Sequence, residues 1–300
     1  MALSGSGSRF AFYIGFLEEL KKAGIPIDYI AACSGGSVVA ASFVCDTLEN
    51  FKQEILKADK KDIFSYLRKG KGGFYNLDVL EEMARSVITK GLKFEEVKPL
   101  MGFVAVDIES GQQVLMSMGD IAHAVRVSCT LPAICEPAKW GGRTLIDGGL
   151  LSFVPVDVLK DAKMDITIGV NMRGTKHLFT GGQMTLRKVF KVFKKALLIE
   201  YIEKVWDMIL PEDESYDLEE TPGIFSVLGR SMDLAIAASK KDKGKVLECD
   251  LMIDMPNVEK YKIRNFGKST QELYELGKKT AWENIPRIRQ LMEEKQKVMA

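Results

Sequence analysis

Residues 28–37 read Asp-Tyr-Ile-Ala-Ala-Cys-Ser-Gly-Gly-Ser, a run of small and apolar residues broken by a serine–glycine turn. The residues from Asp28 to Cys33 predict a short buried strand, and the apolar run from Ser37 to about Leu48 predicts a helix. A strand, a tight turn and a helix in this order form the βα step of a parallel sheet. We therefore expect a fold of the α/β class.

The same turn carries a candidate nucleophile. The run Ala32-Cys33-Ser34-Gly35-Gly36 is a near-match to the G-x-S-x-G nucleophile elbow, in which the serine sits on a strained turn above the sheet. Ala32 adds only a methyl group at the first glycine position. A Ser-Gly-Gly turn is also a common structural connection, so both interpretations stay open on this motif alone. The side chain of Cys33 is expected to point away from Ser34, into the core.

A glycine–serine loop precedes this unit. Residues 4–9 (Ser-Gly-Ser-Gly-Ser-Arg) follow a strand stub at Ala2–Leu3 and precede a helical spacing that ends near Gly24. Successive N–H groups at a helix start can hold an anion. The run does not end in the Gly-Lys-Ser/Thr of a phosphate-binding loop, and Phe10 stands where a dinucleotide-binding loop needs glycine. An oxyanion hole or a plain turn remain as interpretations.

A third motif lies further along the chain. In Leu145–Gly149 an apolar strand places Asp147 on a Gly-Gly turn, as a catalytic carboxylate or as a turn-forming residue. Asn76 is a candidate N-cap, and an acidic loop at 211–222 reads as an exposed insertion. Periodicity also predicts a hairpin over 102–118, strands at 143–146, 165–171 and 249–255, and helices over much of 51–100, over 186–209 and over 268–298.

Composition narrows the class of protein. The 300 residues carry 42 Lys and Arg against 41 Asp and Glu, a formal net charge of +1, whereas a nucleic-acid binder would show a basic excess. A hydrophobic content of 46% excludes intrinsic disorder. The five cysteines follow no metal-binding spacing and predict reduced thiols. Without a signal peptide or a run of roughly 18 apolar residues, we expect a cytoplasmic protein.

The three motifs in this order resemble those of the patatin-like phospholipase family. Residues 3–10 (LSGSGSRF) stand where that family has LSGGG-x-R/K-G, and residues 24–41 (GIPIDYIAACSGGSVVAA) resemble its elbow. Residues 124–137 (AVRVSCTLPAICEP) and 145–157 (LIDGGLLSFVPVD) resemble its aspartate motif with the preceding segment. The resemblance covers residues 2–171 closely, and residues 175–240 are not matched in detail.

The resemblance implies a three-layer α/β/α patatin-like fold with a central, mainly parallel sheet, formed by one domain over residues 1–300. It comprises a motif-bearing core at 2–171, an insertion at 175–240, and a last strand with C-terminal helices at 249–300. The implied activity is hydrolysis of lipid esters, without a metal or organic cofactor. The implied site consists of a Ser34–Asp147 dyad, an oxyanion hole from Gly5, Ser6, Gly7 and Gly35, and a supporting Arg9.

Departures from the family leave alternatives open. Ser6 and Phe10 replace family glycines, Phe153 stands where the family often has Asn, and a positive φ at Ser6 would cost roughly 1–2 kcal/mol. An acyltransferase or thioesterase on the same serine, or a catalytically silent lipid-binding protein, is therefore the alternative function. A histidine relay would need His177, because His123 precedes the aspartate. The helix at 186–209 pairs an apolar face with lysines, as either a core-covering helix or a peripheral membrane contact.

Overall fold

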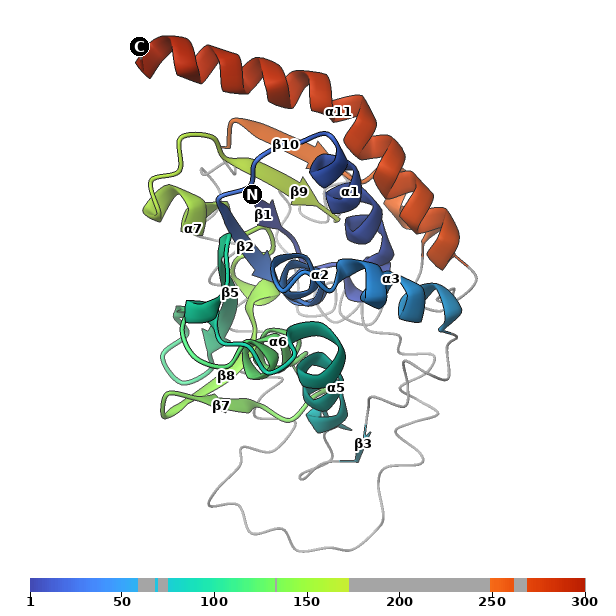
Figure 1. Ribbon diagram of the computed structural model, residues 1–300. Helices are drawn as coiled ribbons and strands as arrows, with labels where there is room; N and C mark the ends of the chain where they lie inside the picture. Colours follow the sequence, from blue (N-terminus) through green and yellow to red (C-terminus); the bar gives the residue numbers. More distant parts are fainter. Residues whose placement is uncertain (59–67, 70–74, 133, 173–248, 262–268, 300) are drawn as a thin grey trace, which may run out of the picture.

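The computed structural model describes residues 1–58, 68–69, 75–132, 134–172, 249–261 and 269–299 (Figure 1). Several predictions lie outside these residues: the insertion at 175–240, the helix at 186–209, the acidic loop at 211–222 and His177. The predicted strands at the N-terminus, at 28–33, at 143–146, at 165–171 and at 249–255 are all confirmed, with small changes of length.

The strands form an eight-stranded sheet in the order β10-β9-β1-β2-β5-β8-β7, with β6 also paired to β5. Pairing is parallel from β10 to β5, whereas β6, β8 and β7 add antiparallel. Arg68–Lys69 (β3) and Tyr75–Asn76 (β4) form a separate antiparallel pair. The strands of the main sheet are Ala2–Leu3 (β1), Tyr29–Cys33 (β2), Leu100–Asp107 (β5), Gln113–Met116 (β6), Ala138–Trp140 (β7), Arg143–Asp147 (β8), Ile168–Asn171 (β9) and Leu251–Asp254 (β10).

Helices connect and cover these strands. The α-helices are Ala11–Lys22 (α1), Gly35–Val44 (α2), Leu48–Lys57 (α3), Asp78–Met83 (α5), Ile121–Ser128 (α6), Val156–Asp161 (α7) and Thr270–Met299 (α11). Shorter turns are Gly7–Arg9 (η1), Phe94–Glu96 (η4), Gly148–Leu150 (η5) and Val258–Lys260 (η6), all 3-10, together with the π-helical turn Ala84–Thr89 (η3).

The two faces of the sheet bury different residues, because successive side chains of a strand point to opposite sides. On one face, Leu3, Ile30 and Phe103 join the main core beneath α1, α2, α6 and α11. On the other face, Ala31 and Val104 pack with residues 154–159 of α7 and its lead-in. Figure 1 shows α1, α2, α3 and α11 to one side of the strands and α7 to the other. The predicted three-layer α/β/α fold is confirmed.

Helix boundaries differ from the predictions in three places. The helix predicted from Ser37 to about Leu48 begins at Gly35 and ends at Val44, and a second helix begins at Leu48. Asp46 has φ of +54°, which breaks the helical path between them. Asn76 accepts a hydrogen bond from the Asp78 N–H at 2.6 Å, although the N-cap position itself is Leu77. The C-terminal segment is one 30-residue helix.

The C-terminal helix packs on the first helix through glycines. A methyl group on Gly15 of α1 would collide with the carbonyl oxygen of Tyr274, and one on Gly277 of α11 with that of Phe12. The two helix backbones therefore touch directly. The Tyr274 hydroxyl donates to Glu18 at 2.6 Å beside this crossing. The N-terminal motif-bearing segment is thus braced by residues at the far end of the chain.

Candidate active site

Ser34 occupies a strained turn between β2 and α2. Its φ of +51° and ψ of −129° lie outside the conformations that non-glycine residues ordinarily adopt. The helix starts immediately, with no room for side chains on its first residues. A methyl group on Gly36 would lie 2.6 Å from the Ser4 carbonyl oxygen, and one on Gly35 would lie 2.8 Å from that of Gly7. The glycines allow the first strand and loop to pack directly on the turn, as the elbow motif requires.

Asp147 ends β8 opposite Ala105 of β5 and is only 5% exposed. One carboxylate oxygen, Oδ1, accepts hydrogen bonds from the Gly149 N–H at 2.8 Å and from the Cys33 thiol at 3.6 Å. The other oxygen, Oδ2, is buried and accepts no hydrogen bond from the described residues. The carboxylate is therefore held by one oxygen and has the second available.

The electrostatics of Asp147 favour a proton acceptor. Burial raises the pKa of its carboxyl group above the ordinary value, because the charged form loses hydration. The nearby Ser34 hydroxyl and the hydrogen bonds from the Gly149 N–H and the Cys33 thiol oppose this rise in pKa. An aspartate in bulk water is a weak base toward a hydroxyl, so a raised proton affinity is what a Ser–Asp pair needs.

Cys33 lies in the core, as expected, and its thiol also contacts Asp147. Cys33 is fully buried in the cluster beneath α7, as a core residue would be, yet its sulfur faces Asp147. The residue before the nucleophile thus contacts the candidate base. Sequence periodicity places Cys33 on the strand but does not reveal this cross-strand neighbour.

The glycine–serine loop lies against the elbow, with one change from the predicted set of donors. The Gly5 N–H donates to the Phe153 carbonyl at 3.1 Å, so this group does not serve as an oxyanion donor here. The N–H groups of Ser6, Gly7 and Gly35 donate to no acceptor among the described residues. These three remain the candidate donors.

Ser6 itself is not strained. Its φ is −118°, and the positive φ of the loop, +54°, falls on Gly7, where glycine accepts it. The strain that a positive φ at Ser6 would cause is therefore absent. The Arg9 backbone N–H and its Nε donate to the Ser6 carbonyl at 3.1 and 3.2 Å. Since C=O and N–H of one peptide point in opposite directions, Arg9 turns the following Gly7 N–H away from itself.

The aromatic ring of Phe153 lies near both the glycine–serine loop and the Asp147 turn. A methyl group on Gly5 would lie 2.9 Å from the Phe153 ring and 3.5 Å from Ser34 Cβ. One on Gly149 would lie 3.4 Å from the same ring and 3.1 Å from Asp147 Oδ1. The Phe153 ring therefore lies beside both members of the candidate dyad.

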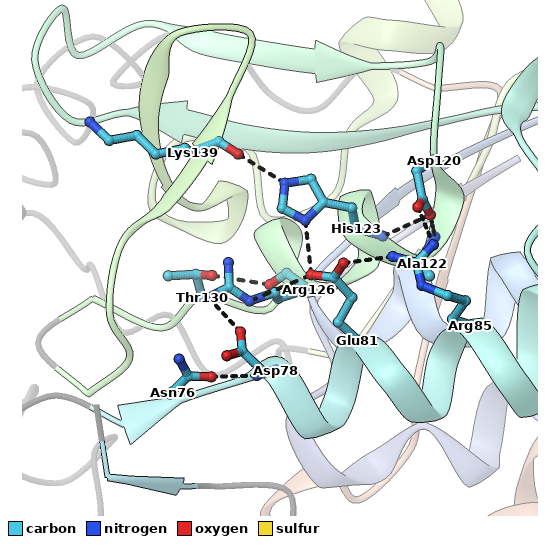
Figure 2. Close-up of polar contacts among 10 residues, drawn as sticks. All are labelled: Asn76, Asp78, Glu81, Arg85, Asp120, Ala122, His123, Arg126, Thr130 and Lys139. Atoms are coloured by element: carbon cyan, nitrogen blue, oxygen red, sulfur yellow. Dashed lines mark hydrogen bonds and ion pairs between the residues drawn. The ribbon is translucent and has the colours of Figure 1, made fainter. Parts of the chain in front are cut away.

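A network of charged side chains connects helix α6 to α5 and β7 (Figure 2). His123 contacts Glu81 of α5 through Nδ1 at 2.8 Å and the Lys139 carbonyl through Nε2 at 2.9 Å. Arg85 bonds Asp120 at the start of α6, and Arg126 lies 3.3 Å from Asp78. The other end of the helix reaches the site, because the Asp147 N–H donates to the Thr130 carbonyl at 2.8 Å.

This network also gives His123 a structural role. Both of its ring nitrogens are taken by Glu81 and Lys139, so it is not part of a relay to Ser34. The described residues contain no group of three or more His, Cys, Asp or Glu side chains arranged to hold a metal ion.

A family model described as patatin-like phospholipase matches residues 1–160, which contain the loop, the elbow and the aspartate turn. The chain belongs to the patatin-like phospholipase family. In the part of this family member that the structure describes, no helix has the length and apolar character needed to cross a membrane.

The individual proteins to which this chain is similar have low sequence identity to it. An uncharacterised NTE family protein of Mycobacterium bovis is 26% identical over 178 residues, which cover 59% of this chain and 49% of that protein. Patatin-like phospholipase domain-containing protein 6 of Mus musculus is 26% identical over 193 residues, 61% of this chain and 14% of that protein. The chain thus spans about half the length of the first relative. VipD from Legionella pneumophila, a solved structure, matches with a TM-score of 0.39 at 14% identity, covering 91% of this chain and 66% of that one.

Proposed function

We propose that this family member is a serine acyl hydrolase that cleaves carboxylic esters of phospholipids or related lipids. The observation that carries the proposal is the pairing of two features. Ser34 sits on a strained elbow, and the buried Asp147 beside it has one fixed oxygen and one free oxygen. The raised pKa of Asp147 supports its use as the base without a histidine.

The reaction proceeds in two steps in this proposal. Ser34 Oγ bonds to the ester carbonyl carbon while its proton passes to Asp147 Oδ2, and the alcohol leaves with that proton. Water then gives a proton to Asp147 and bonds to the acyl carbon, and the released Ser34 oxygen takes the proton back. The N–H groups of Ser6, Gly7 and Gly35 stabilise the oxyanion in both steps.

We also propose that the protein acts in the cytoplasm, where lipid is reached at a membrane surface. All five cysteines are free thiols, which fits a reducing compartment. Three of them, Cys33, Cys45 and Cys135, are buried.

A fluorophosphonate probe with peptide mapping tests the nucleophile. The probe should label Ser34, and Ser34→Ala should lower hydrolysis of p-nitrophenyl butyrate and of phosphatidylcholine vesicles about a thousandfold, or about 4 kcal/mol. Ser42→Ala is the control, since Ser42 is a buried serine of α2 whose hydroxyl bonds the Val39 carbonyl and no other described residue. Labelling elsewhere, or activity of Ser34→Ala near wild type, would refute the proposal.

A further inference from the structure

The backbone N–H of Ser34 has an unusual partner for a residue at the end of a parallel strand. Cys33 pairs with Val104 in the β2–β5 ladder, and Ser34 is the first residue beyond that pair. Because Ser34 turns out of the sheet, its N–H does not continue the ladder. It donates instead to the hydroxyl of Ser128, the last residue of α6, at 2.9 Å.

The Ser128 hydroxyl passes this hydrogen bond on to the sheet. It donates its own proton to the Val104 carbonyl at 2.9 Å, so one side chain satisfies both a donor and an acceptor. Ser128 is fully buried, which leaves no water to replace it. The opposite peptide group of Ser34 is held as well, because its carbonyl accepts from the Ser37 N–H at 2.8 Å and from the Ser37 hydroxyl at 2.6 Å.

We propose that Ser128 is a positioning residue that keeps Ser34 in its strained conformation by bridging the Ser34 N–H to the Val104 carbonyl. A strained backbone conformation persists only where surrounding contacts hold it, and here the Ser128 hydroxyl provides the contact. Without it, two buried polar groups lose their partner. The Ser34 N–H then turns toward the Val104 carbonyl, φ leaves the positive region, and Oγ moves away from Asp147. The catalytic part of this proposal rests on the hydrolase function proposed above.

Three variants separate positioning from packing. Ser128→Ala removes the bridge, Ser128→Thr keeps a hydroxyl at the same place, and Ser42→Ala removes an equally buried hydroxyl elsewhere. We expect Ser128→Ala to lower kcat for p-nitrophenyl butyrate at least tenfold with KM changed less than twofold. The rate of fluorophosphonate labelling should fall in parallel. Ser128→Thr should recover most of the loss, and Ser42→Ala should keep the wild-type kcat.

A backbone measurement tests the proposal independently of catalysis. In crystal structures of wild type and Ser128→Ala, the φ of Ser34 should be positive only in the wild type. If wild type neither hydrolyses esters nor reacts with the probe, the proposed function fails while this comparison still decides the role of Ser128. If Ser128→Ala does not fold, Ser128→Cys, whose thiol bonds poorly, is compared in the same way. A folded variant with positive φ at Ser34 and a wild-type labelling rate would overturn the proposal.

Discussion

The Cys33 thiol lies 3.6 Å from Asp147 Oδ1 and donates a hydrogen bond to it. The residue next to the candidate nucleophile in the chain therefore touches the candidate base across the sheet. This contact favours the charged carboxylate and so lowers the pKa of Asp147, against the larger effect of burial, which raises it. The Gly149 N–H also donates to Asp147 and lowers its pKa. Because few groups oppose the effect of burial, a single substitution at Cys33 should change the pKa of Asp147.

The acid side of the pH–rate profile should report this balance. Asp147 acts unprotonated, so kcat/KM should fall as pH drops through its raised pKa, at higher pH than an ordinary aspartate would give. Cys33→Ala removes one stabilising hydrogen bond from the charged form, and its acid limb should move to still higher pH. Profiles of kcat/KM for p-nitrophenyl acetate measure the shift. Cys45→Ala, a buried cysteine in the other core, should match wild type, and a Cys33→Ala profile identical to wild type would contradict the assignment.

His123 should make stability depend on pH. A neutral imidazole has one N–H, whereas both of its contacts, Glu81 and the Lys139 carbonyl, are acceptors. The hydrogen bond to Glu81 is the main cause that raises the pKa of His123 above its usual 6.5. A raised folded-state pKa contributes stability below the unfolded pKa, and this contribution is lost as pH rises through the folded value.

Urea unfolding of wild type and His123→Gln at several pH values tests this dependence. The stability advantage of wild type should be largest below pH 6.5 and should shrink at higher pH. Ester hydrolysis by His123→Gln should stay close to wild type, because His123 does not contact the dyad. A stability difference that does not vary with pH would exclude a charged His123.

The crossing of α1 and α11 should reverse the usual effect of a glycine-to-alanine change. In a free helix this change stabilises by about 1 kcal/mol. At Gly15 or Gly277 the new methyl group would meet a backbone carbonyl of the other helix, and we expect a loss of about 1–3 kcal/mol instead. Chemical denaturation of each variant measures the sign. Stabilisation by either substitution would show that the two backbones are not in contact.

Phe153 should influence which acyl group fits beside Ser34. Its ring lies against Gly5 and Gly149, so Phe153→Ala opens space next to the nucleophile. The ratio of kcat/KM for a branched pivalate ester over an acetate ester should rise about tenfold, as a change of a few methylene volumes gives in other pockets. Phe94→Leu, a change in the core where Phe94 packs on Phe103, is the control. An unchanged ratio for Phe153→Ala would place the ring outside the acyl site.

The local parts of the site could be predicted from sequence, and the contacts between distant segments could not. Ser34 can be identified as a candidate nucleophile from the sequence, because a strand, a turn and a helix follow each other within a few residues. Ser128 and Thr130 lie in a segment that the resemblance singled out, but their hydrogen bonds to Ser34 and Asp147 join positions far apart in the chain. Periodicity gives the face of a residue and not its neighbour on another strand. For the same reason, the sequence does not predict the hydrogen bond from the Gly5 N–H to the Phe153 carbonyl.

The glycine crossing between α1 and α11 has a consequence for how the chain is made. Gly15 and Tyr274 lie far apart in the sequence, so α1 acquires this neighbour only after residues 270–299 have been synthesised. Until then, the Gly15 face of the helix that follows the glycine–serine loop lacks its contact with α11. The segments that carry Ser34 and Asp147 are translated before α11, so the layer that braces them is completed later. A chain that stops before α11 would therefore lack the brace while already carrying every proposed catalytic residue.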